Sequence, residues 1–131
     1  MQFHLHDGES RFAVTFNPTA DAAIDWMAEH LGQKVRQFSA PWLPEAIEKE
    51  KTDFARFLGI ALTDESERRN EALAALENAR TTIGRTPIAL DYTATTRPLS
   101  LARLLVRYGF NVVRLYIDGV LPEETEDFKR Y

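Results

Sequence analysis

The sequence predicts an α/β protein with a Rossmann-like, doubly wound and mostly parallel sheet flanked by helices. Short runs of β-branched and aromatic residues alternate with longer segments whose apolar residues recur at helical spacing. In the last third, two strands that are apolar on both sides, residues 86–92 and 111–117, are separated by one leucine-rich helix. Such an arrangement predicts a right-handed parallel βαβ unit within a covered sheet.

The first third predicts a strand, a helix and a weaker strand. Residues 11–16 (RFAVTF) have strand composition, and residues 34–38 (KVRQF) repeat it less clearly. Between them, Asn17 is placed to cap a helix, Pro18 fits its first turn, and Gly32 can end it. The apolar face of this helix would contain Ala20, Ala23, Ile24, Met27, Ala28 and Leu31.

The middle of the chain predicts two helices. The first covers residues 40–59, with an apolar stripe opposite a solvated charged face. The second extends from about Asp64, which is a suitable cap, to Thr82. We expect its buried side to consist of Ala72, Leu73, Leu76, Ala79 and Ile83.

The final third completes a single α/β domain over residues 1–131. Residues 11–62 would form a first βα segment with a helical extension, 63–83 a connecting helix, and 84–131 a βαβα unit whose last helix opens at Pro122. A doubly wound sheet usually has more than the four strands predicted here. The sequence therefore favours one domain excised from a longer chain.

Composition narrows the classes of function. The 131 residues are 44% hydrophobic and 27% charged, with a formal net charge of -4, which favours neither a nucleic-acid partner nor an anionic membrane surface. With neither a membrane-length apolar stretch nor a secretory leader, the sequence predicts a cytoplasmic protein. The absence of cysteine excludes disulfides, a thiol nucleophile and any thiolate-held cluster within this chain.

The candidate binding residues lie in the loop between the strand 86–92 and the next helix. Thr93, Thr95, Thr96 and Arg97 offer three hydroxyls and a guanidinium beside a helix N-terminus, an arrangement that favours an anion. The alternative is an ordinary capped turn whose arginine pairs with a nearby carboxylate. Glycine-rich dinucleotide and phosphate-loop motifs are absent, so nucleotide binding by those routes is not expected.

Two weaker candidate sites lie elsewhere in the sequence. His4 and His6 would share a face of a strand and could chelate a metal, but an irregular N-terminus is the favoured explanation of this pair. A second loop, residues 118–121, follows the strand 111–117 and would also lie at the carboxyl edge of the sheet.

The order of elements resembles the nitrogenase component 1 superfamily. The similarity covers roughly residues 12–131 and is carried by "FNPTADAAIDWMAEHLGQK", "WLPEAIEKEKTDFARFLG" and "IGRTPIALDYTATTRPLSLARLLVRYGFNVVRLY". In this family a Gly-Lys/Arg pair opens a strand, as Gly84 and Arg85 do here. An Arg-Pro pair in the ligand loop corresponds to Arg97 and Pro98, whereas the two glycines of the family loop are replaced by other residues.

The resemblance implies a part in an oxidoreductase that receives electrons from an ATP-dependent iron–sulfur reductase. Thr93, Thr95, Thr96 and Arg97 would line a metallocluster or substrate cavity, and Arg97 would donate hydrogen bonds to an anionic cluster. The isolated chain would bind no cofactor. An iron–sulfur or related cluster would be held by ligands from the remaining domains of the parent chain and from a homologous partner subunit.

Two other functional hypotheses stay open. One is a non-catalytic scaffold or assembly domain for cofactor biosynthesis or subunit interaction. The other is a self-contained flavodoxin-like domain that binds a small anion. Treated as a surface residue, Arg97 is expected to tolerate replacement by alanine within about 1 kcal/mol of unfolding free energy.

Overall fold

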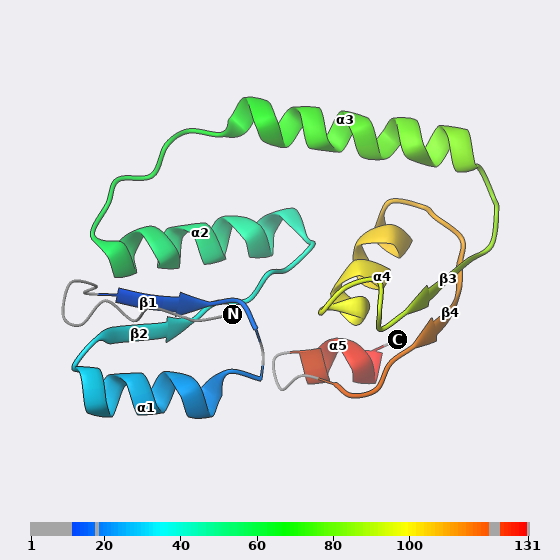
Figure 1. Cartoon of the computed structure of the whole chain (residues 1–131). Coiled ribbons are helices and arrows are strands. Elements are labelled where there is room, and N and C mark those ends of the chain that lie inside the picture. The colour runs from blue at the N-terminus through cyan, green and yellow to red at the C-terminus, as the bar shows by residue number, and fades with distance from the viewer. Residues whose placement is uncertain (1–11, 18, 121–123, 131) are drawn as a thin grey trace, which may run out of the picture. The chain divides into compact units, whose positions relative to one another are not determined.

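The computed structural model describes residues 12–17, 19–120 and 124–130, and within them it contains four short strands and five helices (Figure 1). His4, His6, Pro18 and Pro122 lie outside the described residues. The chain divides into two compact units, one ending at Ser39 and the other beginning at Ala40. That boundary falls inside the predicted 11–62 segment.

The first unit is a parallel βαβ segment built from the predicted strand, helix and weaker strand. Strand β1 (Phe12–Thr15) pairs in parallel with β2 (Lys34–Gln37), and α1 (Asp21–Leu31) connects them. The helix starts later than expected because the Asn17 side chain closes a separate turn. Its Oδ1 accepts a hydrogen bond from the Thr19 backbone N–H at 3.0 Å. The end is as predicted, with Gly32 in the left-handed conformation at φ 59°.

The most deeply buried residue of this unit directly follows β2. Phe38 is 2% exposed, and its ring centroid lies 6.3 Å from that of Phe16. None of the residues of α1 is buried, although Ile24 and Met27 are half-buried on its predicted apolar face. The spacing identified the correct face of the helix, but little of the unit covers it.

The second unit begins with two helices. Helix α2 (Pro44–Leu58) starts at a proline and ends before Gly59, whose φ is 71°. Helix α3 (Ser66–Ile83) begins beyond Asp64, whose Oδ1 accepts a hydrogen bond from the Ser66 N–H at 2.9 Å. This bond lowers the pKa of Asp64, but it closes a turn just before the helix, whose N-cap is Glu65 and has no side-chain cap. The prediction of Asp64 as the cap is therefore wrong by one residue.

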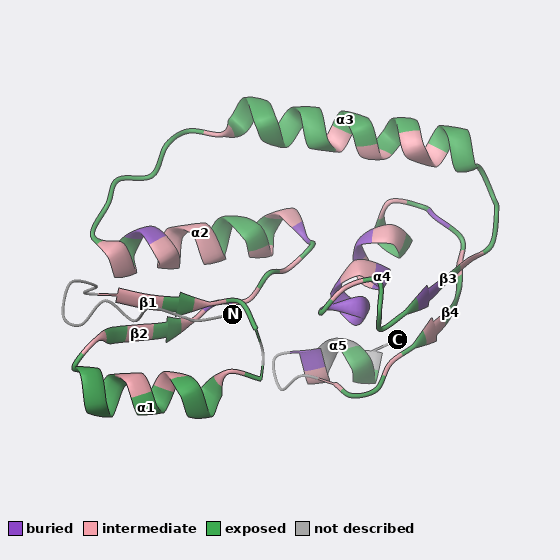
Figure 2. Cartoon of the chain, viewed as in Figure 1, coloured by how far each residue is buried: buried purple, intermediate pink, exposed green. Residues whose placement is uncertain are grey.

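The predicted buried side of α3 is wrong in part. Leu73, Leu76 and Ala79 are only half-buried, while Ala72 and Ile83 are exposed. Figure 2 shows α3 as mainly exposed along its length. Helical spacing therefore identified the stripe, but its residues are at most half-buried.

The second unit also contains the predicted parallel βαβ segment. Strands β3 (Ile88–Asp91) and β4 (Val112–Tyr116) pair in parallel, and α4 (Pro98–Arg107) lies between them in sequence. Helix α4 packs on both strands and buries five residues, which are Pro98, Leu99, Ser100, Ala102 and Leu104. Ser100 is a polar residue at a buried position, and its burial is explained by the hydrogen bonds described below.

The architecture is α/β with short parallel strands. Among the described residues the strands form two separate two-stranded sheets, β1–β2 and β3–β4. A final short helix, α5 (Thr125–Arg130), follows β4. No helix among the described residues has both the length and the apolar character that a membrane span requires.

Candidate functional site

The 93–97 loop connects the carboxyl end of β3 to the first turn of α4. Parallel α/β sheets bind their ligands at this edge, where loops lead into helix N-termini. Arg97 occupies the N-cap position, and its carbonyl accepts the Leu101 N–H at 3.0 Å. The loop therefore has the position that the sequence predicted.

Asp91, the last residue of β3, closes the first turn of the loop. Its Oδ1 accepts the Thr93 N–H at 2.8 Å, and its carbonyl accepts the Ala94 N–H at 3.0 Å. The backbone N–H of Thr93, followed by its hydroxyl, lowers the pKa of the Asp91 carboxyl below its usual value. Asp91 thus serves as an ionised, loop-forming acid.

Trp42, which precedes α2, fixes the far side of the loop. Its indole Nε1 donates to the Thr95 hydroxyl at 3.2 Å, and the same hydroxyl accepts the Arg97 backbone N–H at 3.2 Å. The Trp42 backbone N–H donates to the Ser100 Oγ at 3.1 Å. The two bonds made by Trp42 span more than fifty residues of sequence, and they attach the loop and the start of α4 to the segment before α2.

The N-terminus of α4 holds a carboxylate of the chain itself. Glu124 is 6% exposed, and its Oε1 accepts the Ser100 backbone N–H at 3.1 Å. A helix N-terminus favours negative charge because its first N–H groups lack intrahelical acceptors. The predicted anion position is therefore occupied at Ser100 by Glu124, which was not among the predicted site residues.

The predicted site residues differ in accessibility. Thr93 and Thr96 are exposed, Thr95 is half-buried, and Arg97 is 6% exposed. The premise that Arg97 is a surface residue is therefore wrong. Thr93 and Thr96 are therefore the accessible threonines at the strand edge, and the Thr93 hydroxyl also bonds to Asp91.

The described residues provide no ligand set for a metal ion. Within residues 12–17, 19–120 and 124–130, no three His, Cys, Asp or Glu side chains come together as metal ligands, and the sequence contains no cysteine. His30 is exposed on α1, where its Nδ1 lies 2.9 Å from the Trp26 carbonyl oxygen and its ring stacks on the Trp26 indole.

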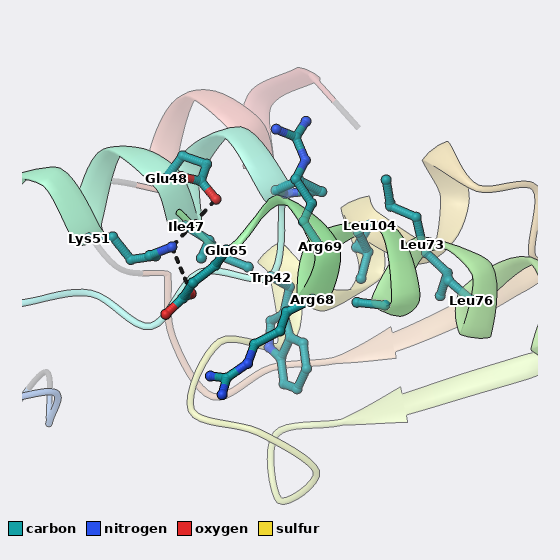
Figure 3. A pocket seen from close by; sticks show the side chains of 12 residues that line it. Trp42, Ile47, Glu48, Lys51, Glu65, Arg68, Arg69, Leu73, Leu76 and Leu104 are labelled. Atoms are coloured by element: carbon teal, nitrogen blue, oxygen red, sulfur yellow. Dashed lines mark hydrogen bonds and ion pairs between the residues drawn. The ribbon is translucent and has the colours of Figure 1, made fainter. Parts of the chain in front are cut away.

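Two recesses of the second unit lie apart from the loop. One, of about 420 Å³, is lined by residues of α2, α3 and α4 together with Trp42 (Figure 3). The other, of about 570 Å³, lies against α4, β4 and Phe128 of α5. Neither is lined by residues 93–97. The helical spacing of α3 contained the signal for the first recess, but sequence analysis assigned those residues to the core.

Comparisons with protein-family models, with curated proteins and with solved structures find no match to this chain.

Proposed function

We propose that this chain is a Rossmann-like α/β part of a nitrogenase component 1-type oxidoreductase, and that its 93–97 loop borders a metallocluster or substrate cavity. The observation that carries the proposal is the parallel β3–α4–β4 segment, which presents a hydroxyl-rich loop at the carboxyl end of β3. Open α/β sheets place ligands at this edge.

The residues present fit a bordering role and do not fit a ligating one. Without cysteine, and without a metal-ligating group among the described residues, cluster ligands would come from other parts of the parent protein or from a partner subunit. Thr96 would offer its hydroxyl hydrogen bond to an anionic group, whereas the Thr93 hydroxyl is engaged by Asp91. Buried Arg97 would fix the turn beneath these threonines and contribute positive charge.

In this function the chain's residues position and shield rather than react. Asp91 and Trp42 hold the loop in one conformation, so the Thr96 hydroxyl needs little reordering when a ligand is bound. A bound iron–sulfur or related cluster would supply the redox chemistry. Electrons would arrive from an ATP-dependent iron–sulfur reductase.

Thr96→Val in the full-length parent protein, purified without oxygen, tests this role. We expect normal folding but an altered electron paramagnetic resonance spectrum of the cluster and slower reductase-dependent turnover. Thr82→Val is the matched control, because this exposed hydroxyl on α3 bonds only to the Asn78 carbonyl at 2.9 Å. Parent protein that contains no iron, or identical spectra for Thr96→Val and wild type, would refute the proposal.

A non-catalytic scaffold or assembly domain is the second candidate, and exposed apolar side chains favour it. Val106, Val113 and Phe128 are 46%, 58% and 52% exposed, and all three line the recess beside α4 and β4. Contiguous apolar surface of this kind commonly marks an interaction site. Iron-free parent protein that still assembles with its partner subunit would favour this function.

A further inference from the structure

The recess between α2, α3 and α4 has the size and the lining of a small-molecule site. Its volume of about 420 Å³ falls within the range of natural ligand pockets. Its apolar walls come from three helices and from the segment before α2, and they include Trp42, Ile47, Leu73, Leu76 and Leu104. A hydrocarbon chain bound in the recess could therefore be covered on several sides.

The α3 wall is a regular stripe of the helix. Residues 65, 68, 69, 72, 73 and 76 line the recess, and their spacing of three and four places them on one face. Leu73 and Leu76 remain half-buried although they point to this face. A bound apolar group would remove their remaining surface from water, which is favourable.

One lysine balances the acids at the rim of the recess. The Lys51 Nζ lies 2.8 Å from the Glu65 Oε2 and 3.8 Å from the Glu48 Oε1. The hydrogen bond between Lys51 and Glu65 raises the pKa of the lysine and lowers that of the acid, so both are charged at neutral pH. These two acids are therefore already engaged by a cation.

Two arginines add further positive charge to the same rim. In Figure 3 the side chains of Arg68 and Arg69 leave α3 in opposite directions. Arg68 acts electrostatically on Glu65, whereas Arg69 forms no ion pair with any residue in the described part of the chain. The lining has three cationic and two acidic side chains, so its net charge is positive.

We propose that this recess binds an amphipathic monocarboxylate. Its apolar chain would lie against Trp42, Leu76 and Leu104, and its carboxylate would accept hydrogen bonds from the Arg69 guanidinium. Guanidinium groups recognise carboxylates through paired, charge-assisted hydrogen bonds, and Arg69 is exposed at the rim, where a carboxylate can reach it. This inference goes beyond the proposed function: the 93–97 loop contributes no residue to the recess, and the two sites share only Trp42, which lines the recess and also bonds to Thr95.

Trp42 provides the signal for a direct test. In a Trp26→Phe background of the full chain, Trp42 is the only remaining tryptophan. Titration with decanoate below its micelle concentration should give a saturable change in Trp42 fluorescence. Arg69→Gln should weaken binding about tenfold, equivalent to about 1.4 kcal/mol. Arg85→Gln, which removes an exposed arginine outside the recess, should leave the affinity unchanged.

Two further measurements separate the parts of the proposal. Decan-1-ol has the same chain without the charge and should bind about as weakly as decanoate binds to Arg69→Gln. Leu76→Gln, a half-buried position on a largely exposed helix, should weaken decanoate and decanol alike. Absence of a saturable signal, equal affinity of Arg69→Gln and wild type for decanoate, or equal binding of decanol and decanoate would each overturn the inference.

Discussion

The two parallel βαβ segments of this chain share a topology. They differ in how many helix residues are buried and in which residues hold the loop after the first strand. In β1–α1–β2 the helix buries none of its residues, whereas in β3–α4–β4 it buries five. The loop after β1 is held by Asn17, Thr15 and Gln37 of its own segment. The loop after β3 is instead held together with the start of α4 by Trp42 and Glu124, which are distant in sequence. The junction of β3 and α4 thus differs from the junction of β1 and α1 because polar groups that are distant in sequence hold it.

Truncation of one leucine in each helix should show the largest difference. Leu104 on α4 is 8% exposed, and Leu104→Ala should lower the unfolding free energy by about 3 kcal/mol because it leaves a cavity. Leu31 on α1 is 43% exposed, and Leu31→Ala should cost less than about 1 kcal/mol. Urea unfolding followed by circular dichroism measures both. Equal losses would contradict the difference in packing.

Replacement of one arginine in each segment should show the second-largest difference in stability. Arg97→Ala removes a buried cation from the junction of β3 and α4 and should cost about 2 kcal/mol. Arg36→Ala changes an exposed residue of β2, whose guanidinium lies 5.0 Å from the Phe38 ring centroid, and should cost about 0.5 kcal/mol. The same urea titration applies. An Arg97→Ala protein as stable as Arg36→Ala would show that the burial of Arg97 does not support the junction.

Most of the secondary structure could be predicted because its signals are local. Proline at the start of α2 and α4, and glycine after α1 and α2, gave element ends to within a few residues. The parallel pairing of β3 and β4 followed from two apolar strands joined by one helix. The start of α1 was missed because the Asn17 side chain bonds to Thr19, a local choice that composition does not reveal.

The candidate site was predicted only in its position. The sequence indicated that Thr93, Thr95, Thr96 and Arg97 form the loop at the end of β3. It could not indicate that Glu124 reaches the Ser100 N–H, because tertiary contacts between distant residues leave no periodic pattern. Burial of Arg97 was missed for the same reason. A single doubly wound sheet likewise remains a prediction, since the described strands form two pairs.

A smaller effect is expected when the Glu124 carboxylate becomes an amide. Glu124→Gln retains an oxygen acceptor for Ser100 but loses the charge that favours the α4 N-terminus, so we expect a loss of about 1 kcal/mol. Glu29→Gln, at an exposed position of α1, should change stability by less than about 0.5 kcal/mol. Thermal unfolding of the two variants checks the pair. A larger loss for Glu29→Gln would reverse the comparison.

The smallest effect concerns pH. The pKa of Asp91 is lowered in the folded protein, so its contribution is complete above the unfolded value of about 3.9 and is lost as the pH falls through the lower folded value. The corresponding turn after β1 uses the Asn17 amide, which does not titrate in this range. Carboxyl carbon shifts in nuclear magnetic resonance should give a depressed pKa for Asp91, and Thr93→Pro, which lacks the donor N–H, should raise it. No change in Thr93→Pro would show that this hydrogen bond does not set the pKa.

Amide hydrogen exchange tests most directly whether residues distant in sequence hold the junction of β3 and α4 but not the junction of β1 and α1. The Ser100 N–H, bonded to buried Glu124, should exchange at least about a hundredfold more slowly than the Thr19 N–H, which is bonded to the neighbouring Asn17. Glu124→Gln should accelerate Ser100 and leave Thr19 unchanged. Equal protection of the two amides in the wild-type protein would contradict the account.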